Sequence, residues 1–233
     1  MSIKNEASEF ASFLENWMID LPVLGLTKGI TQPKKTAIVS VDIINGFCYT
    51  GPLSSPRIAG IVDPICSLFT RAWDLGVRHF LLTQDLHDDG ALEFAQFPVH
   101  CKRGTTECET VDEFKALPFS ANFIIFPKNS THSGLNTGLQ SWIDAHSEVD
   151  TYIVVGDCTD LCTYQLAMHL RLDAYARQLQ RRVLLPENCV QTYDTPVPFA
   201  IQNGLMPHPG DFLHAQFLYH MAMNGIEVVK KLE

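Results

Sequence analysis

The segment from Thr151 to Arg171 restricts the possible folds of this chain more than any other. Residues 152–155 are apolar and mostly β-branched, which predicts a buried strand. After a short turn, apolar side chains recur at helical spacing: Leu161, Tyr164, Met168, Leu172 and Tyr175. A strand that passes directly into a helix is the building unit of α/β domains.

The turn between this strand and helix contains a cysteine in a position suited to chemistry. If Thr159 or Asp160 caps the helix, Cys162 lies in its first turn, where free backbone N–H groups and the helix dipole favour a thiolate. A thiol placed there can be a nucleophile. Free cysteines are also commonly small buried apolar residues, so both interpretations stay open on the turn alone.

Strands and helices alternate along the rest of the chain. Further strands are expected at residues 35–44, 78–83, 122–126, 182–186 and 226–229, and helices at 57–75, 111–117, 135–146 and 209–224. This order predicts a three-layer α/β/α domain with a doubly wound, mostly parallel sheet of about six strands. Residues 1–34 are expected to form an N-terminal helical extension, with its helix at 5–20, and a connector, and 35–233 the main domain.

Composition excludes several classes of protein. The 233 residues are 46% hydrophobic and 18% charged, enough for one sizeable core. The net charge is -9 and no basic run stands out, so nucleic acid is not an expected partner. No apolar run approaches the roughly 18–20 residues of a membrane span. Seven cysteines, an odd number, and no apolar signal core predict a cytoplasmic protein.

Four chemically capable residues follow four different predicted strands: Asp42, Asp85, Lys128 and Cys162. They are expected to converge, because ligands of such sheets bind beyond the carboxyl ends of the strands. Asp42 can accept the thiol proton of Cys162 while Lys128 orients the carboxylate. The backbone N–H groups of Cys158 and Cys162 would then face the developing oxyanion. Without the cysteine, Asp42 and Lys128 would be interpreted as a structural ion pair.

A possible metal site lies in the loop that follows the second of these strands. Asp85 and His87 are two residues apart, so in extended backbone their side chains point the same way. Glu93 and His100 follow on the same loop. One or two carboxylates with two imidazoles suit zinc, and also iron or manganese. The alternative is a hydrogen-bonded loop without a metal.

These motifs resemble the isochorismatase-like cysteine hydrolases, and among them the nicotinamidases. The resemblance rests on VDIINGF around Asp42, FPKNSTHSG around Lys128 and the GDCTDLC turn, and it covers residues 35–229. It implies a catalytic triad of Asp42, Lys128 and Cys162, and a cis peptide bond between Asp157 and Cys158. Asp-x-His followed by Glu and Pro-x-His looks like the nicotinamidase metal site, in which the metal holds the pyridine nitrogen of the substrate.

The resemblance implies hydrolysis of nicotinamide to nicotinate and ammonia through a thioester on Cys162. Phe47 and Phe97 are candidates to sandwich a flat ring. The alternatives are a hydrolase of ureido, N-carbamoyl or maleamate-type amides, or a non-catalytic binding protein. Zinc is the expected cofactor, a small amide the expected partner, and a homo-oligomer the expected assembly. The loop after Asp85 lacks the usual His-Pro and Trp, which bears on the substrate more than on the fold.

Overall fold

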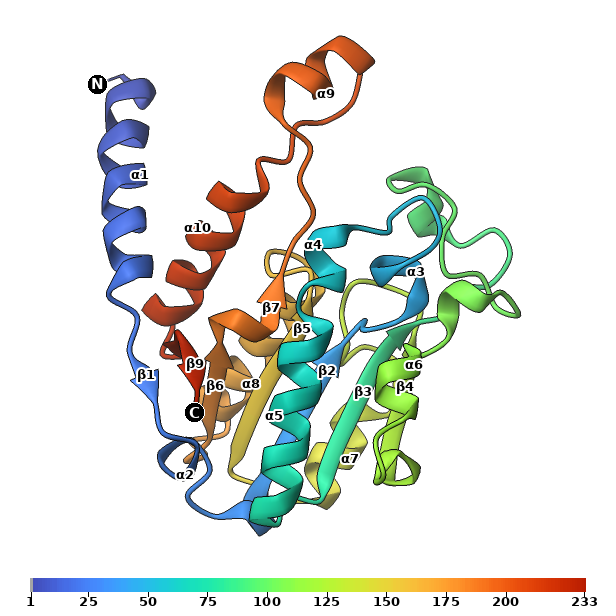
Figure 1. The fold of residues 1–233 in the computed structure, drawn as a ribbon, viewed down its shortest axis with the longest axis vertical. Helices are drawn as coiled ribbons and strands as arrows, with labels where there is room; N and C mark the ends of the chain where they lie inside the picture. The colour runs from blue at the N-terminus through green and yellow to red at the C-terminus, as the bar shows by residue number, and fades with distance from the viewer. Residues whose placement is uncertain (1) are drawn as a thin grey trace.

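A parallel sheet organises the chain, in the computed structural model that describes residues 2–233. Its strands lie in the order β4-β3-β2-β5-β6-β8, with the short β7 paired to β5, and every pair is parallel. Helices lie on both sides of the sheet (Figure 1). The predicted three-layer, mostly parallel architecture is therefore confirmed.

The sheet strands are β2 (Thr36–Val41), β3 (His79–Asp85), β4 (Phe123–Lys128), β5 (Thr151–Asp157), β6 (Arg182–Pro186), β7 (Val190–Gln191) and β8 (Glu227–Val229). The α-helices are α1 (Ile3–Ile19), α2 (Leu26–Gly29), α3 (Asn45–Cys48), α4 (Pro56–Ala59), α5 (Val62–Leu75), α6 (Asp112–Lys115), α7 (Leu139–Ala145), α8 (Cys162–Ala176), α9 (Val197–Asn203) and α10 (Gly210–Met223). The short 3₁₀ helices are η1 (Pro33–Lys35), η2 (Leu92–Ala95), η3 (Thr106–Cys108), η4 (Ser120–Asn122) and η5 (Glu187–Cys189).

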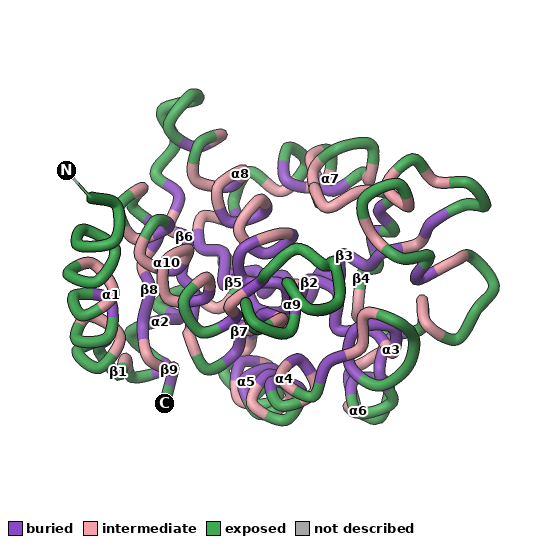
Figure 2. The backbone as a smooth tube through the Cα atoms, turned by 90° about the horizontal axis from the view of Figure 1, so that it is seen from above, coloured by how far each residue is buried: buried purple, intermediate pink, exposed green. Residues whose placement is uncertain are grey.

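Two apolar cores cover the two faces of the sheet. In β2, Ile38 belongs to the core under α5 and α6, whereas Val39 belongs to the core under α7, α8 and α10. Successive side chains of a strand point to opposite faces, so a strand covered on both sides is apolar along most of its length. All residues of β2 and β5 are buried, and Figure 2 shows buried residues concentrated in the central strands.

The N-terminal segment is joined to the C-terminus. The strand β1 (Val23–Leu24) pairs in parallel with β9 (Lys231–Leu232) in a second, two-stranded sheet that the sequence did not indicate. The helix α1 lies beside α10, where Phe10, Phe13 and Trp17 surround the ring of Tyr219. The division of the chain at residue 34 stays a prediction.

The structure corrects the predicted apolar face of α8. Leu172 and Tyr175 are about half exposed, at 49% and 50%. A second stripe with the same spacing, Leu166, Leu170 and Ala174, is buried against the sheet instead. Both stripes are apolar, so periodicity could not choose between them, and the crossover geometry of β5 decided which one packs.

Two further differences from the predicted elements concern helices. The helix expected over residues 57–75 is divided into α4 and α5, since Gly60 and Ile61 separate them. The helix α9 was not predicted. It stands away from the domain on two chain segments that Thr195 and His208 join by an antiparallel bridge (Figure 1). None of the helices in residues 2–233 combines the length and apolar character that a membrane crossing requires.

Candidate active site and metal centre

The carboxyl ends of four adjacent strands bring the predicted residues together. Asp42 directly follows β2, Asp85 and Lys128 are the last residues of β3 and β4, and these two are partners in the strand register. Cys162 is the first residue of α8, after β5. Asp42 has a φ of 55°, a left-handed conformation that is rare outside glycine and often found at functional sites.

Lys128 lies between two buried carboxylates. Its Nζ is 2.8 Å from Oδ2 of Asp42 and 2.5 Å from Oδ1 of Asp85, and none of the three side chains is more than 2% exposed. The backbone N–H of Asp85 donates to Oδ1 of Asp42 at 2.8 Å. Lys128 Nζ also contacts Sγ of Cys162 at 3.6 Å. One ammonium group therefore connects both carboxylates with the thiol.

The surroundings separate the acidities of the two carboxyl groups. Burial raises the pKa of Asp42 to about 7, although Lys128 opposes this. Burial acts in the same direction on Asp85, but Lys128, His100 and His87 outweigh it and bring the pKa of Asp85 below its ordinary value. Asp42 is thus suited to exchange a proton near neutral pH, and Asp85 to stay ionised.

The surroundings of Cys162 oppose the thiolate that the start of a helix favours. Burial raises the pKa of its thiol well above the usual range, and the charge of Lys128 only partly opposes this effect. Neither Thr159 nor Asp160 caps the helix, since the N-cap is Leu161 and it makes no side-chain cap bond. The resting thiol therefore keeps its proton until Asp42 removes it.

The turn before α8 leaves backbone donors free. In the described part of the chain, the N–H groups of Cys158 and Cys162 donate to no protein acceptor. The peptide bond between Asp157 and Cys158 is cis, as the resemblance implied. Gly156 has a φ of 115°, and a Cβ atom there would lie 2.0 Å from the carbonyl oxygen of Val41. Only glycine allows β5 to approach β2 so closely at this point.

Three of the four predicted metal ligands gather beside this ion cluster. The ligand atoms of Asp85, His87 and His100 all lie within 4.8 Å of one another, and all three residues are buried. Nε2 of His87 is 3.6 Å, and Nε2 of His100 3.7 Å, from Oδ2 of Asp85. Nε2 of His87 is buried and has no hydrogen-bond partner in residues 2–233. A divalent cation bound between these atoms would satisfy it, so the donor set fits zinc, iron or manganese.

The other ring nitrogens of both histidines are held by hydrogen bonds. Nδ1 of His87 lies 2.8 Å from Oδ1 of Asn129, and Nδ1 of His100 lies 2.7 Å from the carbonyl oxygen of Pro98. Such contacts fix the tautomer that presents Nε2 to a metal. Asn129 was missed in the sequence, although its place directly after Lys128 could have indicated it.

Asn129→Ala is expected to weaken metal binding by about 10–100-fold, because His87 loses the partner that orients its ring. Titration of the metal-free protein with zinc in a competing chelator measures this change. Asn16→Ala, on the remote helix α1, is the control and should bind zinc as the wild type does. Equal affinity in the two variants would contradict the orienting role of Asn129.

Glu93 lies near the metal ligands but outside their cluster. It is half-buried on η2, and burial together with the charge of Asp85 raises its pKa. Its carboxylate is not among the ligand atoms that lie within 4.8 Å of one another. Its role as a ligand stays a prediction.

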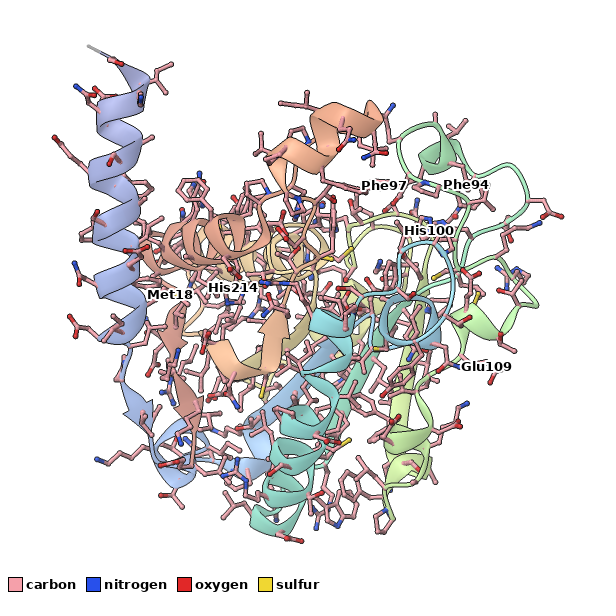
Figure 3. All side chains as sticks on the ribbon, turned by 45° about the horizontal axis from the view of Figure 1, so that its top comes forward. Met18, Phe94, Phe97, His100, Glu109 and His214 are labelled. Atoms are coloured by element: carbon pink, nitrogen blue, oxygen red, sulfur yellow. The ribbon has the colours of Figure 1, made fainter. Side chains whose placement is uncertain are left out.

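Aromatic rings surround His100. The ring centroids of Phe47 and Phe97, the two predicted substrate contacts, lie 5.8 and 6.3 Å from it. Phe94, which the sequence did not indicate, lies 5.7 Å from His100 and 5.3 Å from His87. Figure 3 shows Phe94, Phe97 and His100 together at one end of the domain. These rings provide flat apolar surfaces beside the polar cluster.

Side chains from the C-terminal segment hold the nucleophile turn, residues 157–162, from behind. The hydroxyl of Thr159 lies 2.8 Å from Nδ1 of His214, and Oδ2 of Asp160 lies 2.7 Å from Nε2 of His208. Glu187 lies on the far side of His214, 3.6 Å from its Nε2, and 3.0 Å from Nζ of Lys230. None of the three histidine contacts could be found from sequence, since the partners are far apart in the chain.

Glu187→Gln is expected to destabilise the protein by about 1 kcal/mol at pH 7. Burial alone would raise the pKa of Glu187, but hydrogen bonds from His214 and Lys230 outweigh it and lower that pKa. A lowered folded-state pKa adds stability above the ordinary value of 4.5, and this stability is lost as the pH falls further. Urea unfolding at several pH values should therefore show the difference from wild type vanish in acid. Glu6→Gln, at an exposed position of α1, is the control.

Comparison with known proteins identifies the family. Residues 36–204 match the isochorismatase domain. Nicotinamidase 1 of Arabidopsis thaliana is 24% identical over an alignment of 221 residues, and the match covers 87% of this chain and 88% of that protein. The structure of a pyrazinamidase of Pyrococcus horikoshii in complex with zinc is similar with a TM-score of 0.64 and 19% identity, over 84% of this chain and 99% of the other.

A third similar structure is the N-carbamoylsarcosine amidase of Thermoplasma acidophilum, with a TM-score of 0.62 and 21% identity over 84% of this chain and 96% of the other. The solved structures support the fold, and the domain match covers most of the sheet and the strand ends that carry Asp42, Lys128 and Cys162. The chain therefore belongs to the isochorismatase family of hydrolases.

Proposed function

We propose that this protein is a metal-dependent nicotinamidase, which hydrolyses nicotinamide to nicotinate and ammonia through a thioester on Cys162. The observation that carries the proposal is the shared Lys128: it contacts the thiol, the proton acceptor Asp42 and the metal ligand Asp85 within one buried cluster. A nucleophile and a metal ligand that are this close can act on two ends of one small substrate.

The first half of the reaction needs a base and an anion site. Asp42 takes the thiol proton while Sγ of Cys162 attacks the carboxamide carbon. Oδ2 of Asp42 lies 2.8 Å from Nζ of Lys128, and a carboxylate oxygen that accepts one hydrogen bond keeps a second lone pair, which can take that proton. The N–H groups of Cys158 and Cys162 stabilise the negative oxygen. Asp42 then returns the proton to the amine, the C–N bond breaks and ammonia leaves.

The second half uses the same groups in reverse. Asp42 removes a proton from water as the water oxygen attacks the thioester carbon, and the C–S bond breaks to release nicotinic acid, which ionises to nicotinate. Asp42 then gives its proton to Sγ of Cys162, which restores the thiol and the carboxylate. Lys128 stays charged throughout, because Asp42 and Asp85 outweigh burial and raise its pKa well above the usual range. It therefore compensates the charge that moves between Asp42 and Cys162.

The metal would be held by Asp85, His87 and His100. When bound, it supplies a Lewis acid that can coordinate the ring nitrogen of a pyridine. The rings of Phe47, Phe94 and Phe97 beside His100 suit a flat aromatic substrate. By contrast, Arg103 is 61% exposed and pairs with Asp88, so it does not provide the buried cation that a ureido acid would need.

Ammonia release from nicotinamide tests the proposal. Protein prepared metal-free and then loaded with zinc, iron or manganese is assayed with nicotinamide, benzamide and an N-carbamoyl amino acid. Hydrolysis of nicotinamide at least about 100-fold faster than of benzamide is expected, since benzamide lacks the ring nitrogen. Equal rates for the two aromatic amides, or hydrolysis of the carbamoyl compound alone, would overturn the assignment.

A further inference from the structure

The contacts behind the nucleophile turn have no part in the reaction described above, yet they involve both side chains at its centre. Thr159 and Asp160 lie between Cys158 and Cys162, whose N–H groups face the substrate carbonyl in the proposed reaction. Each is tied to a histidine of the C-terminal segment, Thr159 to His214 and Asp160 to His208, and all four residues are buried. Figure 3 shows His214 on α10, well away from the aromatic cluster around His100.

We propose that His208 and His214 are positioning residues, which hold the nucleophile turn in the geometry that catalysis requires. The inference rests on the proposed function for its kinetic consequences. Neither histidine contacts Cys162, Asp42 or Lys128 in the described structure, so each acts through its partner in the turn.

The contact between Asp160 and His208 is the stronger of the two. Asp160 also accepts a 2.6 Å hydrogen bond from the hydroxyl of Thr192, and its side chain is only 5% exposed. The imidazole of His208 stacks on Tyr193 with ring centroids 3.7 Å apart, and its Nδ1 lies 3.0 Å from the carbonyl oxygen of Tyr193. Burial alone would raise the pKa of Asp160, but the bonds from His208 and Thr192 outweigh it and lower that pKa.

The segment that supplies His208 is itself anchored independently of the turn. Arg57 on α4 donates to the carbonyl oxygen of Thr192 at 2.9 Å and pairs with Asp211 on α10 at 2.7 Å. The backbone N–H of Thr159 donates to the carbonyl oxygen of Gln191 at 3.0 Å. The turn is thus fixed to a supported frame at one backbone position and two side chains, which leaves it little freedom to shift.

Small displacements of such a turn have large kinetic effects, because the nucleophile and the oxyanion donors lie on the same few residues. A shift of about 1 Å can cost about 100-fold in rate. Substrate binding, in contrast, is proposed to depend on the metal ligands and the aromatic rings, which lie on other elements. Loss of the contact between Asp160 and His208, or of that between Thr159 and His214, should therefore lower kcat and leave KM nearly unchanged.

His208→Phe and His208→Gln separate the effect of the hydrogen bond to Asp160 from that of the ring stacked on Tyr193. Phenylalanine can keep the stacking on Tyr193 but cannot donate to Asp160, whereas the amide of glutamine can donate. We expect a kcat about 10–100-fold below wild type for His208→Phe, with KM within about 3-fold, and recovery to within about 3-fold of wild-type kcat for His208→Gln. His220→Phe, at an exposed histidine of α10, should retain wild-type kinetics.

Alkylation of Cys162 by iodoacetamide, followed by mass spectrometry of its peptide, gives a readout that needs no amide substrate. Its rate should fall in His208→Phe and recover in His208→Gln. Thus, if the wild-type protein hydrolyses no nicotinamide, the proposed function fails but the positioning role is still decided. Wild-type alkylation and kcat in His208→Phe, or an equal loss in both His208 variants, would overturn the inference.

Two variants of Thr159 test its contact with His214, and they decide the proposal if His208→Phe does not fold. Thr159→Val removes the hydroxyl that meets His214, and Thr159→Ser keeps it. We expect Thr159→Val to lose about 10-fold in kcat and in the alkylation rate, and Thr159→Ser to stay within about 3-fold of wild type. Equal behaviour of valine and serine would contradict the proposal.

Discussion

Cys162→Ala is expected to lower the hydrolysis of nicotinamide by about 10⁴-fold or more, because the thiol that contacts both Lys128 and Asp42 is lost. The thiol lies 3.6 Å from Nζ of Lys128, at the first position of α8 and beside Asp42. Removal of Sγ leaves the metal ligands and aromatic rings in place. Nicotinamide should therefore still bind, and calorimetry of the metal-loaded variant should detect that binding.

The control for this experiment is the same substitution at a cysteine outside the site. Cys66 lies on α5, is only partly buried and belongs to neither the triad nor the metal cluster. Cys66→Ala should keep wild-type kcat and remain labelled by iodoacetamide at Cys162. Residual activity above about 1% in Cys162→Ala would show that water is activated directly, without a covalent intermediate, and the thioester mechanism would be abandoned.

Lys128→Met is expected to destabilise the protein by about 3–5 kcal/mol and to abolish activity. The substitution leaves the carboxylates of Asp42 and Asp85 buried together without a cation, since Lys128 is within 2.8 Å of both and neither is more than 2% exposed. Urea unfolding of the metal-free protein measures the loss of stability. Lys115→Met is the control, because its ion pairs are exposed and should contribute less than about 1 kcal/mol.

A double substitution shows whether repulsion between the carboxylates of Asp42 and Asp85 causes the loss of stability in Lys128→Met. In Asp42→Asn/Lys128→Met, only one of the two carboxylates that Lys128 contacts remains, so the double variant should be clearly more stable than the sum of the two single losses predicts. Additive losses would instead indicate that Lys128 stabilises the fold by packing alone. Both variants should be inactive, as each lacks the base or the cation that the proposed mechanism requires.

The central strands of the main sheet were predictable because they are buried on both faces and are mostly apolar in the sequence. β2, β5 and β6 lie close to their predicted positions for this reason. Short elements have too few residues to show a hydrophobic periodicity, so β1, β9 and α9 were not predicted. The outward stripe of α8, with Leu172 and Tyr175 exposed, shows that periodicity alone cannot identify the packed face when two stripes are apolar.

The sequence by itself determined which residues meet, since the topology of a parallel sheet brings the residues after each strand to one edge. That reasoning placed Asp42, Lys128 and Cys162 in one site before any distance was known. Only the tertiary structure decided their charges, because pKa values depend on burial and on neighbours from other strands. Burial raises the pKa of Asp42 to about 7 and raises the pKa of the Cys162 thiol well above its usual range.

The tertiary structure also revealed which side chains support the site. Asn129 reaches His87 from a different strand end, and His208 reaches Asp160 from a segment 48 positions later in the chain. Such contacts follow no spacing rule, because they depend on how two loops pack rather than on the period of a helix or strand. The sequence therefore determined the reacting groups, and the packing of the loops determined how firmly they are held.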